Sequence, residues 1–198
     1  MGNAASPGSQ RPAPRQAPPQ AQASRPQDNS GEPRTFTPKQ RQALLRRYQV
    51  HDASRDGRVG IPLDICLAMP EFAGNNLISV LIHDYLDSQT GRMHPQGFLQ
   101  FCTFLSDCTP AVDKKRMLFD SFNVYGTETF THDEIYRIYK VLLGHIISDD
   151  HILALTFEAL KHPGLEKQGQ ITKKEFLQMV PDSEIDQKLT LRFNIPAG

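Results

Sequence analysis

Residues 51–64 read HDASRDGRVGIPLD and place acidic or small polar side chains at alternate positions. Counted from Asp52, the first, third and fifth positions hold Asp52, Ser54 and Asp56, and a glycine follows. This pattern is typical of a calcium loop between two helices, in which oxygens converge on the ion. Such a loop ends in a glutamate that supplies two oxygens, but the corresponding residue is Leu63. We therefore expect a loop that keeps its fold and has lost useful affinity for calcium.

Equivalent segments recur along the chain. Polar stretches that end in one apolar residue repeat every 34 to 41 residues, and these end residues are Val59, Met93, Phe130 and Ile171. Each takes the loop position at which paired loops join through a short β-bridge. Apolar residues at three- and four-residue spacing on both sides of the loops indicate helices. The sequence thus predicts an all-α fold, an EF-hand repeat of four helix–loop–helix hands in two lobes.

Three capping boxes mark helix starts within this repeat, at Thr37–Gln40, Thr131–Glu134 and Thr172–Glu175. In such a box the threonine side chain and the side chain three residues later each bond the other's backbone N–H. With the helices placed from these starts, we expect an N-terminal pair of hands over residues 35–107. A C-terminal pair with an extended final segment follows over residues 113–198.

The other loops also lack parts of the calcium-binding pattern. The second has no carboxylate at a ligand position and ends in Gly97. The third ends correctly in Glu134, but its first position falls on Asn123 inside an apolar pattern, so we expect a loop that has lost residues and binds no metal. The fourth ends in Glu175 and begins with Gly164, which removes the first carboxylate.

Six side chains of the first and fourth loops remain as candidate metal ligands: Asp52, Ser54, Asp56, Glu166, Gln168 and Glu175. Weak calcium binding by either loop stays open, and the low number of carboxylates indicates millimolar affinity or worse.

Residues 1–34 differ in kind from the rest. After Met1 they contain no large apolar or aromatic side chain and are rich in Pro, Gln, Ala and Ser, so we expect a disordered tail. The opening MGNAAS matches the N-myristoylation pattern, with Gly2 as the acceptor and Ser6 at its last position. One myristoyl chain gives reversible membrane binding. We therefore expect a cytoplasmic protein with peripheral membrane contact through its N-terminus.

Composition excludes several functions. The 22 basic and 22 acidic residues cancel, which argues against nucleic acid as a partner. The three cysteines form no Cys-x-x-Cys pair, and no apolar stretch is long enough to span a membrane. The sequence contains no metalloprotease motif, nucleophile elbow or phosphate-binding glycine loop, so we expect no enzymatic activity.

From about residue 36 to residue 195 the chain resembles calcineurin B and the calcineurin B homologous proteins. The most specific stretches are MPEFAGNNLI at Met69–Ile78, DEIYRIYKVLLGHIISDDHI at Asp133–Ile152 and IDQKLTLRF at Ile185–Phe193. The resemblance implies a regulatory subunit with four EF-hands that binds an amphipathic helix of a larger partner. For calcineurin B this partner is the catalytic subunit of a calcium-dependent Ser/Thr phosphatase, and for the homologous proteins a juxtamembrane helix of a sodium/proton exchanger.

The connection between the lobes is short, as in calcineurin B, which favours a phosphatase partner, whereas the closing QKLTLRF, residues 187–193, resembles the C-terminal segment of the homologous proteins. An ion-transporter cofactor and a weak calcium sensor stay open as alternatives. The incomplete C-terminal loops depart from the family pattern, which implies a subunit that holds its partner without a calcium switch. The identity of the partner is not encoded in any motif of this sequence.

A helix-binding groove needs apolar and aromatic side chains on the helices of both lobes. Nine residues are candidates for its lining: Phe98, Phe101, Leu105, Met117, Phe122, Tyr139, Leu142, Phe176 and Met179. The final stretch KLTLRFNIP, residues 188–196, alternates apolar and polar residues and predicts an extended segment. We expect this segment to pack over the groove and to compete with a partner, and the alternative is that it adds a strand to another protein.

Overall fold

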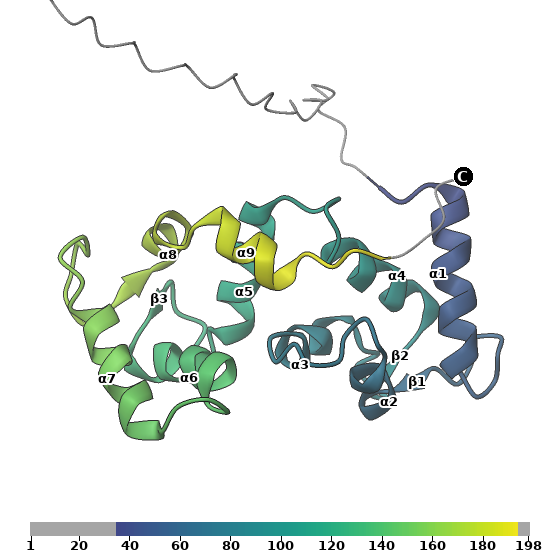
Figure 1. Cartoon of the computed structure of the whole chain (residues 1–198), viewed down its shortest axis with the longest axis horizontal. Helices are drawn as coiled ribbons and strands as arrows, with labels where there is room; N and C mark the ends of the chain where they lie inside the picture. Colours follow the sequence, from purple (N-terminus) through teal and green to yellow (C-terminus); the bar gives the residue numbers. More distant parts are fainter. Residues whose placement is uncertain (1–34, 194–198) are drawn as a thin grey trace, which may run out of the picture. The chain divides into compact units, whose positions relative to one another are not determined.

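Four helix–loop–helix hands follow one another along residues 35–193, the part of the chain that the computed structural model describes (Figure 1). The hands are formed by α1 (Pro38–His51) with α2 (Leu63–Ala68), α3 and η1 (Ile78–Leu81 and Ile82–Tyr85) with α4 (Pro95–Phe104), α5 (Ala111–Phe122) with α6 (His132–Leu143), and α7 (Asp149–Leu160) with α8 (Lys173–Met179). A further helix, α9 (Asp182–Leu189), follows the fourth hand. The predicted all-α EF-hand fold is confirmed.

Two-stranded bridges pair the hands. β1 (Ile61–Pro62) lies antiparallel to β2 (Arg92–Met93), and β3 (Thr129–Phe130) to β4 (Ile171–Thr172). Hands 1 and 2 therefore form an N-terminal pair, and hands 3 and 4 form a C-terminal pair. All described residues belong to one compact unit, residues 33–198, so a domain boundary between the pairs stays a prediction.

The bridge positions were predicted correctly at Met93, Phe130 and Ile171, but the choice of Val59 was wrong. Ile61 faces Met93 and is fully buried, whereas the Val59 side chain is 44% exposed. The first loop is longer than expected by two residues, because the chain turns through glycines with positive φ at both Gly57 and Gly60. In the other hands the closing residue comes four after the bridge residue, so the closing position of hand 1 is Ile65 and not Leu63.

All three capping boxes are present. Thr37 N–H donates to Gln40 Oε1 at 2.9 Å, and Gln40 N–H donates to Thr37 Oγ1 at 3.3 Å. The boxes at Thr131 and Thr172 have the same reciprocal arrangement. Each satisfies N–H groups that the first turn of a helix leaves without a partner, and such a cap contributes about 1 kcal/mol.

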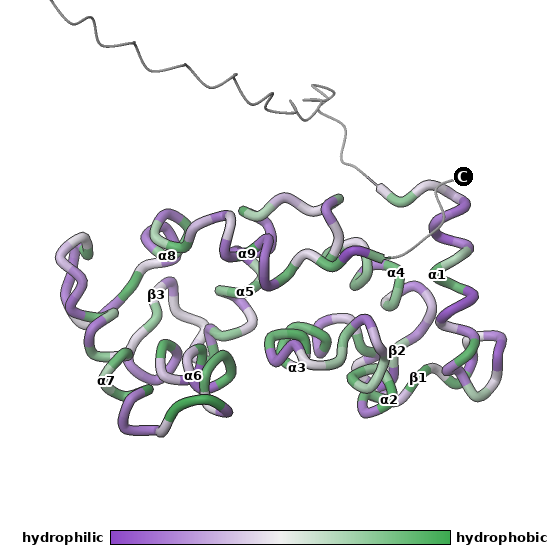
Figure 2. Tube along the Cα trace, in the orientation of Figure 1, coloured by the Kyte–Doolittle hydropathy of each residue, from purple (hydrophilic) through white to green (hydrophobic). Residues whose placement is uncertain are grey.

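The core of each pair is built around aromatic rings. In the N-terminal pair the ring centroids of Phe72 and Phe101 are 5.3 Å apart. In the C-terminal pair Phe119 stacks on Phe130 at 4.0 Å, with Phe176 against both. Figure 2 shows hydrophobic and hydrophilic residues interleaved along α1 and α9, as amphipathic helices on a shared core require. Within residues 35–193, no helix is both long and apolar enough to cross a membrane.

Candidate functional site

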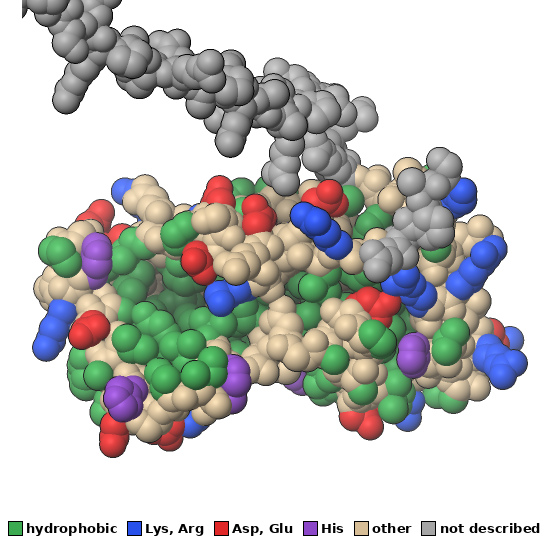
Figure 3. Space-filling model, in the orientation of Figure 1, with side chains coloured by type: hydrophobic (Ala, Val, Ile, Leu, Met, Phe, Trp, Pro, Cys, Tyr) green, Lys and Arg blue, Asp and Glu red, His purple; other side chains and the backbone are tan. Residues whose placement is uncertain are grey.

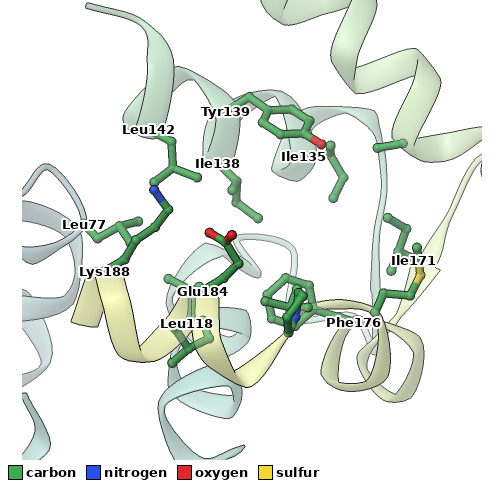
Figure 4. Close-up of a pocket in the computed structure, with 15 residues that line it drawn as sticks. Leu77, Leu118, Ile135, Ile138, Tyr139, Leu142, Ile171, Phe176, Glu184 and Lys188 are labelled. Atoms are coloured by element: carbon green, nitrogen blue, oxygen red, sulfur yellow. The ribbon is translucent and has the colours of Figure 1, made fainter. Parts of the chain in front are cut away.

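The C-terminal pair carries an apolar groove of about 330 Å³ (Figures 3 and 4). Its walls come mostly from α5, α6, α8 and α9, with one residue each from α7 and β4, and Leu77 of the N-terminal pair lies at one end. Figure 3 shows hydrophobic side chains gathered in a hollow on this face, and Figure 4 shows Ile138, Tyr139 and Leu142 of α6 facing α9 across it. The shape and lining suit the apolar face of a guest helix.

The structure divides the nine candidate groove residues. Four line the groove: Tyr139, Leu142, Phe176 and Met179. Four others are core residues of at most 2% exposure and do not line it: Phe98, Phe101, Leu105 and Phe122. The ninth, Met117, is half-buried, and its Sδ accepts a hydrogen bond from the Tyr85 hydroxyl at 3.3 Å. The core residues differ from the prediction because a pattern of apolar spacing does not tell a buried face from an open one.

Sequence reasoning missed the α9 wall of the groove, formed in part by Glu184, Ile185 and Lys188. The segment from Lys188 was expected to be extended, but α9 includes Lys188 and Leu189, and only the residues after Leu189 leave the helix. Signals for this helix were present. Pro181 precedes it. Its first turn carries acidic residues and its last turn carries a lysine, and both charges interact favourably with the helix dipole.

The segment after α9 covers the N-terminal pair instead of the groove. Leu189 is fully buried, and Leu191 N–H donates to the Leu105 carbonyl at 2.6 Å. The Phe193 ring then meets Phe36 edge-on at 6.0 Å. In Figure 1 this yellow segment leaves α9 and runs past α4 toward the start of α1. Up to residue 193 the final segment packs on the chain itself, but on the N-terminal pair and not over the groove as expected.

Two neighbouring buried lysines of α5 hold the ends of α9. Lys115 Nζ donates to the carbonyls of Leu177 and Val180, at 2.9 and 2.7 Å, and pairs with Asp182 Oδ1 at 2.6 Å. Lys114 Nζ donates to the Ser106 carbonyl at 2.8 Å and to Thr190 Oγ1 at 2.6 Å. Burial lowers the pKa of Lys114, because desolvation disfavours the charged amine.

The polar side chains of the first loop bond one another. Asp52 is buried, and its Oδ2 accepts from Ser54 Oγ at 2.7 Å and from Gly57 N–H at 2.8 Å. Burial alone would raise the pKa of Asp52. The hydrogen bonds that its carboxylate accepts lower the pKa by more than burial raises it, so the pKa lies below its ordinary value. Asp56 pairs with Arg58, whose Nε lies 2.8 Å from Oδ2. The loop therefore neutralises its own second carboxylate.

In the fourth loop the closing glutamate, Glu175, also accepts hydrogen bonds from its own loop. Glu175 Oε1 accepts from Glu166 N–H at 2.7 Å, and Oε2 accepts from the N–H and hydroxyl of Thr172, at 2.7 and 2.6 Å. The Thr172 hydroxyl, followed by these backbone groups, lowers the pKa of Glu175. The Glu166 side chain is 72% exposed, and Gln168 Nε2 donates to the His162 carbonyl at 3.1 Å. Neither of them converges with Glu175 on a common point.

The third loop is not shortened, contrary to the prediction. Because α5 ends at Phe122, the loop begins at Asn123, and Asn123 Oδ1 accepts from Thr127 N–H at 3.0 Å. Among the described residues, two buried carboxylate oxygens have no hydrogen-bond partner, Asp52 Oδ1 and Glu134 Oε1. One belongs to the first loop and the other to the third.

The donor set of the loops does not fit calcium, which takes six to eight oxygens around one point. Across residues 35–193, no three Asp, Glu, His or Cys side chains come together in a way that would hold a metal. In the first and fourth loops Asp52 Oδ2 and both oxygens of Glu175 accept hydrogen bonds from the loop itself. The hands keep the shape of EF-hands with protein hydrogen bonds at the ligand positions.

Comparisons with known proteins agree with this architecture, although no family model matches the chain. The calcineurin B chain of Naegleria gruberi is 26% identical over 160 residues, covering 79% of this chain and 88% of the relative. Calcineurin B type 1 of Dictyostelium discoideum is 23% identical over 168 residues, covering 84% and 90%. Human calcineurin B type 2 is 22% identical over 151 residues, covering 75% and 86%. These relatives support the resemblance to the calcineurin B family that the sequence indicates.

The three stretches that most resemble the calcineurin B family lie around the groove. Met69–Ile78 includes Leu77 at the end of the groove, Asp133–Ile152 includes its α6 wall, and Ile185–Phe193 begins within its α9 wall. The predicted myristoylation site, Gly2, and the predicted tail of residues 1–34 lie outside the described residues. The part of the chain that resembles this family is therefore the part that builds the groove.

Proposed function

We propose that this chain is a non-catalytic, calcineurin-B-like regulatory subunit that binds an amphipathic helix of a larger protein. The observation that carries the proposal is the apolar groove of the C-terminal pair, which no described segment of the chain fills. Ile135, Ile138 and Leu142 line it at three- and four-residue spacing along α6. A guest helix with its own apolar stripe would cover this surface and remove it from water.

A phosphatase catalytic subunit is the favoured partner. The curated relatives are named as subunits of calcineurin, and the connection between α4 and α5 is short, at residues 105–110. The alternative, an ion transporter such as a sodium/proton exchanger, rests on the sequence resemblance of the C-terminal segment alone. The groove itself suits either helix, so the partner has to be decided by binding experiments.

The proposal includes loss of calcium switching. Glu175 and Asp52 already accept hydrogen bonds from their own loops, which supports a groove that stays open without an ion. Weak calcium binding in the first or fourth loop is the competing hypothesis. N-myristoylation at Gly2 would add reversible membrane contact to a cytoplasmic subunit, and this part of the proposal rests on the sequence pattern alone.

The test uses the full chain and two labelled peptides in fluorescence anisotropy without calcium. One peptide is the helix through which a calcineurin catalytic chain holds calcineurin B, and the other is a juxtamembrane helix of a sodium/proton exchanger. We expect the phosphatase helix to bind at least about tenfold more tightly, a difference of about 1.4 kcal/mol. Tighter binding of the exchanger helix would replace the favoured partner by the alternative.

A pair of substitutions locates the binding site. Leu142→Asp places a charge in the groove and should weaken the phosphatase helix by at least about tenfold. Val50→Asp makes the same change on α1, where the valine is 79% exposed, and should leave binding unchanged. Equal affinities for both variants and the wild type would contradict a binding site in this groove.

A further inference from the structure

The groove contains one acid that has no partner. Of the 15 residues that line it, only Glu184 and Lys188 carry a charge, and both belong to α9. In Figure 4 the Glu184 carboxylate extends from α9 into the groove toward Ile138, above Leu118. Within residues 35–193, the structure gives this carboxylate no hydrogen bond and no ion pair. Lys188 lies one turn further along α9, beside Leu77 and Leu142, and forms no salt bridge with it.

The Glu184 carboxylate opposes binding once a guest helix covers the groove, because it then loses its solvating water. In the free chain the Glu184 side chain is exposed, so water solvates its charge. A guest with a wholly apolar face would remove that water and leave the carboxylate facing Ile138 and Leu118 without a partner. Desolvation of an unpaired charge is strongly unfavourable. A charge of opposite sign compensates for this cost, because the attraction between the two charges is stronger in apolar surroundings than in water.

We infer that the groove selects a guest helix that carries a basic residue within its apolar face, positioned to pair with Glu184. This inference rests on the proposed helix-binding function and specifies the chemistry of the partner. Arginine suits the position better than lysine, because its planar guanidinium forms two parallel hydrogen bonds with a carboxylate. Glu184 then acts as a specificity determinant that favours basic guests and rejects helices with an acid at the same place.

The experiment uses three designed amphipathic peptides of about 14 residues, which span about 21 Å as helices. They share a leucine-rich face and differ at one central position of that face, which holds Arg, Gln or Glu. Affinities are measured by fluorescence anisotropy for the wild type, Glu184→Gln and Glu184→Arg. Glu128→Gln is the matched control, because it removes the same charge from an exposed position outside the groove. Circular dichroism checks that every variant is folded.

For the wild type we expect the Arg peptide to bind about three- to fivefold more tightly than the Gln peptide, and the Glu peptide to bind more weakly than both. Glu184→Gln should remove most of this ranking, Glu184→Arg should invert it, and Glu128→Gln should keep it. Higher ionic strength should reduce the advantage of the Arg peptide.

The outcomes separate this inference from the proposed function. Equal affinity of the Arg and Gln peptides for the wild type, or an unchanged ranking in Glu184→Gln, would overturn the role of Glu184 while helix binding stands. If the three peptides bind the wild type no better than they bind Leu142→Asp, the proposed function fails as well.

Discussion

The two pairs of hands have the same plan but different surfaces. In the N-terminal pair the apolar side is covered by the chain's own final segment, where Leu191 bonds to Leu105 and Phe193 meets Phe36. In the C-terminal pair the apolar side forms an open groove with α9 as one wall. The repeat of hands therefore determines the bridges and the core, while a segment outside the repeat determines which apolar face is available to a partner.

Deleting a buried aromatic ring from either core should cause the greatest loss of stability, and the effect on helix binding should differ between the two cores. Phe98→Ala in the N-terminal pair and Phe119→Ala in the C-terminal pair each delete a buried ring and should each lower the free energy of unfolding by about 3–5 kcal/mol. Urea unfolding measures this cost. Only Phe119→Ala should also weaken the phosphatase helix, because Phe119 lies beneath the groove against Phe176. If both variants weaken the helix equally, the two pairs do not act separately.

A smaller effect is expected from opening the covered side. Leu191→Asp should lower the free energy of unfolding by about 1–2 kcal/mol, because it places a charge where half-buried leucine packs on the core. It should also increase binding of a hydrophobic dye as the N-terminal pair becomes exposed. Arg192→Asp changes the exposed neighbour and serves as the control. Equal behaviour of the two variants would show that the final segment does not cover this surface.

Acid should destabilise the fourth loop through Glu175 and much less through the exposed Glu166. The pKa of Glu175 is lowered in the folded state, so its contribution to stability is full above the ordinary value of 4.5 and is lost as the pH falls through the lowered value. Glu175→Gln should therefore be less stable than the wild type at neutral pH, and the gap should close on acidification. Glu166→Gln, at an exposed carboxylate of the same loop, should show little gap at either pH. Thermal unfolding across this pH range measures both.

Calcium should have the smallest effect. With millimolar affinity, 0.1 mM calcium as added ligand should change the free energy of unfolding by less than about 0.1 kcal/mol. Isothermal titration calorimetry on the full chain checks this directly. Micromolar uptake would mean that the loops rearrange to present Asp52, Glu134 or Glu175 to the ion, and it would favour a calcium sensor over a constitutive helix-binding subunit.

Local chemistry in the sequence predicted much of the fold. The capping boxes at Thr37, Thr131 and Thr172 place helix starts, because they depend only on residues three apart. Met93 and Ile171 follow a loop glycine by two residues and were assigned correctly to the bridges. The same spacing selected Val59 wrongly, because a second glycine at Gly60 lengthens the first loop and brings Ile61 to the bridge.

The groove was harder to predict, because its lining depends on contacts between distant parts of the chain. Phe98 and Phe176 have the same apolar character, yet the first is core of the N-terminal pair and the second lines the groove. Glu184 was missed because no helix was expected before Lys188. Without that helix, the sequence does not indicate which side chains of this segment face the groove. What covers the N-terminal pair depends on Leu191 reaching Leu105, a contact that no local pattern encodes.

The adjacent amines of Lys114 and Lys115 have a mechanical consequence. Lys115 bonds to the chain before α9 and Lys114 to the residue after it, so one turn of α5 fixes both ends of the groove wall. A swing of α9 away from α6 would break the contacts of both amines with Asp182 and Thr190 at the two ends of α9. The two lysines therefore fix the distance between α9 and the rest of the groove, and a guest helix has to fit a groove of constant width.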